Sequence, residues 1–110
     1  MKRVYLSGAI TGIPEEEYRA NFTRAEEFYK AIGYDVVNPV KLSDELLKVK
    51  PEVKYEDFMK VDLAELKKCT HIAMLDGWEK SNGCRIEREQ ATLDGLIICY
   101  FKVPEDYSEL

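Results

Sequence analysis

Residues that bind metals or form disulfides are scarce in this sequence, which has one histidine, His71, and three cysteines. The cysteines are odd in number and none lies in a Cys-x-x-Cys pair. This pattern argues against a disulfide framework and predicts free thiols in a reducing compartment. A zinc site needs a cluster of histidine and cysteine ligands, which one histidine does not supply. We therefore expect neither a metal nor a cofactor.

Long apolar runs and clusters of basic residues are also lacking. No run reaches the roughly 18 apolar residues that a membrane span needs. The opening MKRVYLSG has no signal-peptide core or cleavage site. The net charge is −5, and the lysines and arginines are scattered, which argues against a long phosphate backbone as ligand. We expect a cytoplasmic protein that binds a small molecule and neither a membrane nor polymeric nucleic acid.

Strand-like and helix-like segments alternate along the chain. Its 110 residues, 45% of them hydrophobic, fit one globular domain spanning residues 1–110. Apolar patterning predicts strands at 2–6, 34–37, 71–75 and 96–101, and helices at 13–33, 44–49, 55–68 and 84–94. This alternation predicts an α/β fold: a small doubly wound, Rossmann- or flavodoxin-like three-layer sandwich with a parallel sheet of four to five strands.

Two of the predicted helices carry apolar stripes that we expect to face the core. The stripes consist of Tyr18, Phe22, Ala25, Tyr29 and Ile32 on the first helix, and of Tyr55, Phe58, Met59, Leu63 and Leu66 on the helix at 55–68. On the last helix, Ile86 and Leu93 lie roughly opposite the face that carries Ala91. A helix with two apolar faces suggests a second partner surface, and we expect a homo-oligomer.

Two glycine-bearing loops follow predicted strands, SGAITG after the first and DGWEKSNG after the third. Ligands of doubly wound folds bind beyond the carboxyl ends of the strands, where these loops lie. SGAITG has neither the GK[ST] element of a P-loop nor a GxGxxG fingerprint, and a purely structural turn remains an alternative. Its candidate binding residues are Gly8, Ile10, Thr11 and Gly12.

Two carboxylates fall on helix faces that are otherwise apolar or closely packed. Asp62 lies in the stripe between Met59 and Leu66, and Glu87 shares a face with Ala91. An ionised carboxylate that faces a core is unfavourable unless it is paired, so both are candidates to reach a cleft. Alternatively, Asp62 turns to solvent or caps a backbone group, and Glu87 only favours the start of its helix electrostatically.

The loop before the last helix contains further candidates. Ser81 or Asn82 could cap the helix, or together with Gly83 present donors to an anionic group. Trp78 could stack on an aromatic ligand or pack on the surface. Asp76 ends the third strand, in a good position for a ligand hydroxyl.

Four stretches together resemble the nucleoside 2-deoxyribosyltransferase superfamily, which includes the 2′-deoxynucleoside 5′-monophosphate N-hydrolases and a branch of short, mostly uncharacterised phage and bacterial relatives. The stretches are VYLSGAITG, KVDLAEL, SNGCRIE and ATLDGLII, and the resemblance covers residues 2 to about 101. Their order and spacing are more specific than any one of them. The chain looks most like the short branch.

The resemblance implies a catalytic set of Glu87, Asp62 and Tyr5. Glu87 matches the nucleophile that attacks the anomeric carbon of a deoxyribose, and Asp62 matches the carboxylate that contacts the sugar or assists the base. Tyr5 matches a tyrosine hydroxyl near the nucleophile. From the pattern alone, Tyr5 could also be a core aromatic.

The resemblance also assigns the binding loops. Gly8, Ile10 and Gly12 match the loop that lines sugar and base, and Ser81 and Gly83 match the segment that holds the 5′ group. The chain departs from the nucleotide hydrolases in two places. Thr11 stands where they carry a basic residue, and Arg85 could supply the missing charge; Glu89 stands where a glycine is frequent.

These residues predict cleavage or transfer of the N-glycosidic bond of a deoxynucleoside or its 5′-monophosphate. A nearby carboxylate stabilises or traps an oxocarbenium-like state, and a second acid can protonate the departing base. Two alternatives remain: a nucleotide-binding or sensing module without turnover, and an oligomeric scaffold without a ligand. The sequence does not distinguish hydrolysis from transfer.

Overall fold

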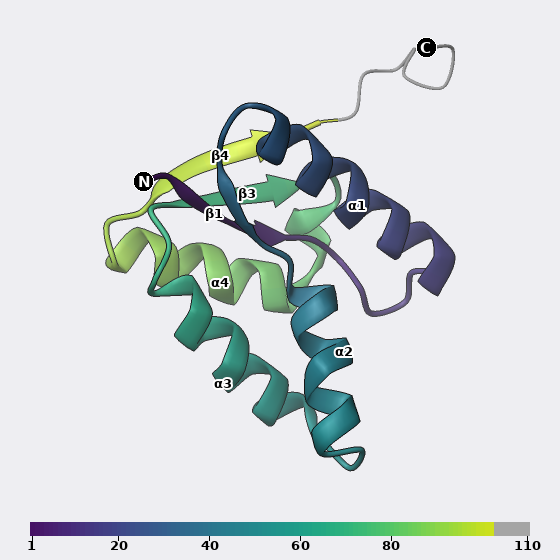
Figure 1. Ribbon diagram of the computed structural model, residues 1–110. Helices are drawn as coiled ribbons and strands as arrows, with labels where there is room; N and C mark the ends of the chain where they lie inside the picture. The colour runs from purple at the N-terminus through teal and green to yellow at the C-terminus, as the bar shows by residue number, and fades with distance from the viewer. Residues whose placement is uncertain (103–110) are drawn as a thin grey trace.

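The computed structural model describes residues 1–102, and residues 103–110 lie outside the described part of the chain. In chain order the elements are β1 (Arg3–Ser7), α1 (Glu15–Ala31), β2 (Asp35–Val37), α2 (Pro39–Val49), α3 (Tyr55–Leu66), β3 (His71–Leu75), the 3₁₀ turn η1 (Trp78–Lys80), α4 (Asn82–Leu93) and β4 (Ile97–Phe101) (Figure 1). Among residues 1–102, no helix is long and apolar enough to cross a membrane.

Within residues 1–102, four parallel strands form one sheet in the order β2-β1-β3-β4. The chain steps outward from β1 to β2 and then returns past β1 to β3. The strand order therefore reverses between β1 and β3, which is where doubly wound folds bind ligands. The predicted α/β, flavodoxin-like fold is confirmed, and the four strands of the described sheet lie within the predicted four to five.

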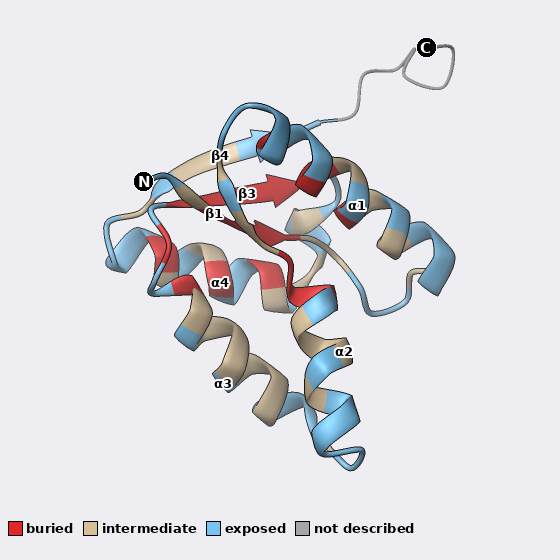
Figure 2. Cartoon of the chain, in the orientation of Figure 1, coloured by how far each residue is buried: buried red, intermediate tan, exposed pale blue. Residues whose placement is uncertain are grey.

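Alternating residues of the central strands face opposite layers of the molecule. Val4 and Leu6 pack with residues of α1 such as Phe22, whereas Tyr5 belongs to the core shared with α3 and α4, for example Leu66. In Figure 1, α1 lies on one side of the sheet and α3 and α4 lie on the other. Figure 2 shows the buried residues concentrated in β1, β3 and the sheet-facing side of α4. This arrangement is the predicted three-layer sandwich.

Helix α2 begins at Pro39, five residues before the helix predicted at 44–49. The Asn38 side chain caps it by accepting the Val40 N–H at 3.0 Å, and Pro39 occupies the first helical position. Asn-Pro is a common end of a strand, but it is equally a cap followed by a favoured first residue. The segment least well predicted from sequence is therefore a regular helix.

Two positions of the predicted apolar stripes differ from expectation. Ile32 is 56% exposed because it lies beyond the last turn of α1, and Tyr55 is 57% exposed as the first residue of α3. β4, an entirely apolar strand, lies at the edge of the sheet and leaves Ile97 and Tyr100 more than half exposed.

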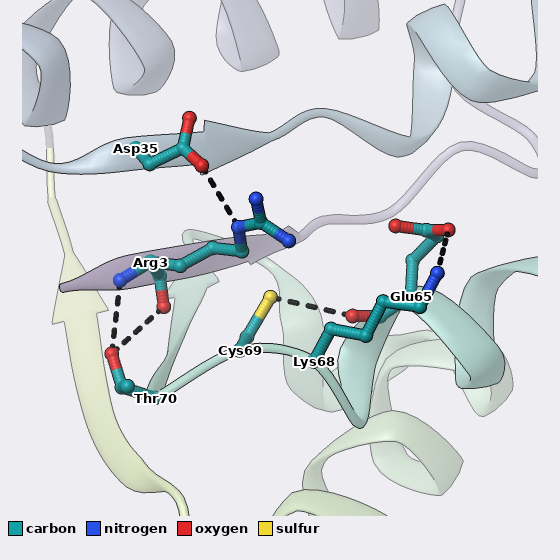
Figure 3. Close-up of polar contacts among 6 residues, drawn as sticks. All are labelled: Arg3, Asp35, Glu65, Lys68, Cys69 and Thr70. Carbon is teal, nitrogen blue, oxygen red and sulfur yellow. Dashed lines mark hydrogen bonds and ion pairs between the residues drawn. The ribbon is translucent and has the colours of Figure 1, made fainter. Parts of the chain in front are cut away.

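The amino ends of the strands are tied together by polar contacts (Figure 3). Arg3 donates its backbone N–H to Thr70 Oγ1 at 3.0 Å, and its Nε pairs with Asp35 Oδ2 at 2.8 Å. Behind them, the Cys69 thiol donates to the carbonyl of Glu65 at 3.4 Å. These contacts set the register at the edge opposite the carboxyl ends, which are left for the candidate site.

Candidate active site

Glu87 is held against the middle of the sheet by α4. Ser81 caps this helix, its Oγ accepting the Cys84 N–H at 3.2 Å. Cys84, Glu87 and Ala91 make up its buried residues. The predicted shared face is therefore present, and its small residues let the helix pack closely enough to bring a carboxylate to the sheet.

Two hydroxyls of β1 hold the Glu87 carboxylate. Tyr5 Oη donates to Oε2 at 2.5 Å, and Ser7 Oγ donates to Oε1 at 2.7 Å. Both hydroxyls lie on the α4 side of β1 because residues two apart in a strand face the same way. Ser7 was not predicted as a site residue, although its spacing from Tyr5 could have indicated it.

Burial raises the pKa of Glu87, while the hydrogen bonds from Tyr5 and Ser7 oppose that rise. Burial, followed by the charge of Glu87, raises the pKa of Tyr5 well above its usual value. The phenol therefore stays protonated and acts as a donor. The carboxylate is buried, but its position is fixed by two hydrogen bonds.

Asp62 projects from α3 into the same pocket as Glu87. Burial raises the pKa of Asp62 to about 7, and the charge of Glu87 contributes in the same direction. A carboxyl group with this pKa is partly protonated near neutral pH and can donate a proton. The two carboxyl groups thus have different environments: one is hydrogen-bonded against the sheet, and the other is a weak acid on the pocket wall.

The pocket has a volume of about 310 Å³, at the lower end of the range for small-molecule sites. The β1–α1 loop, α1, α2, α3 and the start of α4 all contribute to its walls. Gly8 begins the loop where there is no room for a side chain. A Cβ there would lie 2.9 Å from the ring of Phe22 and 3.1 Å from Leu75.

Most of the predicted site residues converge on this pocket. Its lining includes Gly8, Ile10, Thr11, Asp62, Ser81, Gly83 and Glu87, and Tyr5 reaches it through Glu87. The lining residues that sequence reasoning missed come chiefly from α1 and α2: Tyr18, Arg19, Ser43, Asp44 and Leu47. The α2 residues were missed because this helix was not expected to begin at Pro39 and form a wall.

Five predicted binding residues lie outside the lining: Gly12, Asp76, Trp78, Asn82 and Arg85. Gly12 has a φ of 82° and serves the turn before α1, and Asp76 and Asn82 are exposed. Trp78 and Arg85 line a separate surface pocket with Arg88, whose guanidinium lies 5.2 Å from the Trp78 ring centroid. The 3₁₀ turn after β3 places Trp78 there. Arg85 and exposed Glu89 therefore both line this outer pocket and not the candidate active site.

A metal centre finds no candidate ligands in the part of the chain that the structure describes. No group of three or more histidine, cysteine, aspartate or glutamate side chains is arranged there to hold an ion.

A flavodoxin-like sheet with two carboxyl groups in a pocket near the carboxyl ends of its strands defines the class: a small α/β protein with a pocket of the size of a small molecule. The chain belongs to the family described as Domain of unknown function (DUF4406), whose profile matches residues 2–100. No curated protein matches the sequence.

Solved structures share the fold. The CMP N-glycosidase BcmB of Clostridium botulinum is 19% identical, with a TM-score of 0.62 over 96% of this chain and 72% of its own. The 2-deoxyribosyltransferase of Bacillus psychrosaccharolyticus is also 19% identical, with a TM-score of 0.67 over 94% of this chain and 74% of its own. The similarity of fold predicted from the sequence motifs is thereby confirmed over nearly the whole chain.

Proposed function

We propose that this protein cleaves or transfers the N-glycosidic bond of a deoxynucleoside or deoxynucleoside 5′-monophosphate. The observation that carries the proposal is the pairing of Glu87, held by Tyr5 and Ser7, with Asp62 in one pocket. The fold similarity to an N-glycosidase and a deoxyribosyltransferase supports it.

In the proposed reaction, one oxygen of ionised Glu87 attacks the anomeric carbon of the sugar. The carbon–nitrogen bond breaks, and the base leaves with the bonding electrons and takes a proton from Asp62. The resulting glycosyl-enzyme ester is then opened by water, which gives hydrolysis, or by a second base, which gives transfer. Ionised Asp62 accepts the proton from the incoming group, so the enzyme returns to its starting state.

Tyr5 and Ser7 act as positioning residues in this proposal. Their hydrogen bonds fix the plane of the Glu87 carboxylate, and the bonds weaken as the ester forms and negative charge leaves the carboxylate. Ser81, Gly83 and the loop residues Gly8, Ile10 and Thr11 surround the space for the sugar and base. Gly12, Asp76, Trp78, Asn82 and Arg85, which lie outside the lining, have no role in it.

The test is base release from a panel of deoxynucleosides and their monophosphates, followed by chromatography. Glu87→Ala should reduce the rate at least about 1,000-fold, because the nucleophile is removed. Glu89→Gln is the matched control, since it alters an exposed acid of the same helix. Wild-type activity that survives in Glu87→Ala would contradict the proposal, as would an inert wild type across the panel.

A nucleotide-binding or sensing module without turnover is the second candidate. It is favoured by the raised pKa of Glu87, since burial reduces the ionised fraction that can attack. In that case deoxynucleosides or their monophosphates raise the melting temperature and are recovered unchanged.

We also propose that the protein self-associates and is located in the cytoplasm. Leu93 and Ile97 are 74% and 58% exposed, and with Ile86 they are exposed apolar residues of α4 and β4 that a second copy of this one-domain chain could cover. Light scattering after size-exclusion chromatography should give a mass above that of a monomer. The free thiols of Cys69, Cys84 and Cys99 suit the cytoplasm.

A further inference from the structure

The guanidinium of Arg19 is engaged by two carboxylates. Its Nη1 and Nη2 pair with Asp44 Oδ2 and Oδ1 at 2.9 and 2.8 Å, a bidentate contact between α1 and α2. Its Nε also donates to Glu15 Oε2 at 2.8 Å, one turn earlier on the same helix. The charge of Arg19 is therefore already matched within the protein.

The pocket as a whole carries an excess of acid. Among the described residues that line it, Arg19 is the only lysine or arginine, whereas Asp44, Asp62 and Glu87 are acidic. Asp44 alone balances Arg19. Once Glu87 is ionised, the lining has a net negative charge even with Asp62 protonated, and this charge repels an anion.

The amino ends of α2, α3 and α4 all contribute to the lining, and the backbone field at each favours an anion. Each end is already partly satisfied within the protein: the Val40 N–H donates to Asn38 Oδ1 at α2, and the Lys54 N–H donates to Asp57 Oδ2 at α3. At the amino end of α4, Ser81 Oγ accepts a hydrogen bond from the Cys84 N–H, and the Ser81 carbonyl accepts one from the Arg85 N–H. Tyr55 lies against this end, its hydroxyl 3.4 Å from where a Cβ of Gly83 would be. A neutral hydroxyl group fits beside such neighbours with little change, whereas a phosphate needs more donors and more space.

We propose that the pocket selects 2′-deoxynucleosides that lack a 5′-phosphate, and that the Arg19–Asp44 ion pair is a determinant of this selection. The inference rests on the proposed function and names its substrate class. Asp44 supplies a negative charge at the pocket and holds the cation that a phosphate would otherwise use.

Steady-state rates on the four common 2′-deoxynucleosides and their 5′-monophosphates test the proposal. For the best base, kcat/KM should be at least about 30-fold higher for the nucleoside, as the repulsion of a dianion by a net negative pocket implies. Equal values, or higher values for the monophosphate, would overturn the inference while leaving the proposed function standing.

Asp44→Asn tests the ion pair itself. It removes one negative charge and releases Arg19, so the preference for nucleoside over monophosphate should fall about tenfold, chiefly through better use of the monophosphate. Asp94→Asn makes the same charge change at the exposed end of α4, where Asp94 Oδ1 accepts a hydrogen bond from Gln90 Nε2 at 3.1 Å, and it should keep the wild-type ratio. An equal change in both variants overturns the role of the ion pair.

The double variant Arg19→Gln/Asp44→Asn gives a second reading if Asp44→Asn alone does not fold. It removes both charges of the pair and leaves the net charge of the lining unchanged, so the preference for nucleoside over monophosphate should stay near the wild-type value. A selective loss of monophosphate activity would instead identify Arg19 as a phosphate ligand and overturn the proposal.

If no turnover is seen, ligand-induced shifts of the melting temperature test the selection of nucleosides separately from the proposed catalysis. A shift with deoxynucleosides and none with monophosphates supports the selection, although the catalytic proposal fails. The reverse pattern overturns the selection. Wild-type protein that neither reacts with nor is stabilised by either class contradicts both.

Discussion

Glu87 illustrates how a buried carboxylate can be stable and still be available for the proposed reaction. Two hydroxyls satisfy its oxygens, so the group is not an unpaired buried charge. The same bonds decide how readily it ionises, because they favour the charged form that burial disfavours. Reactivity and stability at this residue therefore depend on the same two contacts.

Tyr5→Phe tests that dependence. The variant leaves Glu87 Oε2 without its donor, which should lower the free energy of unfolding by about 1–2 kcal/mol and raise the pKa of Glu87 further. Since the nucleophile must be ionised, the acidic limb of the pH–rate profile should move to higher pH. Urea unfolding and pH–rate measurements check both effects. Tyr29→Phe, a buried tyrosine in the core on the α1 side of the sheet, should leave the acidic limb in place.

Asp62→Asn tests the acid. Since the pKa of Asp62 is about 7, its protonated fraction falls as pH rises through neutrality, and wild-type activity should fall with it. The variant should lose about 100-fold in kcat and lack this alkaline limb. If the limb persists in Asp62→Asn, another group is the acid.

At the scale of elements, α2 acts as a wall that α1 holds in place. Glu26 of α1 is 8% exposed and accepts hydrogen bonds from Lys41 Nζ at 2.7 Å and from Asn38 Nδ2 at 3.1 Å. Burial would raise the pKa of Glu26, but hydrogen bonds from Lys41, Lys30 and Asn38 outweigh it and lower the pKa to about 2. Together with Arg19–Asp44, this contact attaches α2 to α1 at two points.

Glu26→Gln should loosen the start of α2. We expect a loss of about 1–2 kcal/mol, a modest value because both lysines are more than half exposed, and a rise in KM of about two- to fivefold with kcat little changed. The folded pKa lies below the usual 4.5, so this contribution is present above about pH 4.5 and is lost as pH falls towards 2. Denaturant titrations at pH 7 and at pH 3 measure this difference. Glu27→Gln, an exposed neighbour, should behave like wild type at both.

At the scale of the whole molecule, the candidate site makes stability fall as pH rises, which is opposite to the effect of Glu26. The pKa of Asp62 is about 7 in the folded protein against 3.8 ordinarily, so the folded state holds an extra proton between these values. Stability therefore falls as pH rises from about 4 to 7, by at most about 4 kcal/mol from this group. Glu87 acts in the same direction.

Thermal melts at pH 5.5 and pH 8 test this dependence. The wild type should melt several degrees higher at pH 5.5, and Asp62→Asn should shrink the difference by gaining stability at pH 8. Stability that is independent of pH over this range would show that Asp62 does not carry a raised pKa.

The layers of the molecule could be predicted because strand and helix patterns alternate and only a few topologies satisfy that alternation. Asp62 and Glu87 could be identified because an ionised carboxylate on an apolar helix face is unfavourable unless it is paired or reaches a cleft. Arg19 could not, because its neighbour Glu15 makes it look like an ordinary solvated pair, and its contact with Asp44 spans 25 residues. Trp78 and Arg85 were misplaced because a short 3₁₀ turn, invisible in the residue pattern, turns that segment outward.

The anchoring of Glu87 to the central strand β1 has a consequence for how the protein fails. Its two hydrogen bonds join α4 to the sheet. We therefore expect them to break only when the core between α4 and β1 opens. On heating, any glycosidic activity should therefore be lost at the same temperature at which the core unfolds. No folded but inactive form should be seen at lower temperature. By contrast, α2 is held to α1 by the partly exposed ion pairs Arg19–Asp44 and Lys41–Glu26. Because salt screens such pairs, high salt should weaken ligand binding while Glu87 stays in position.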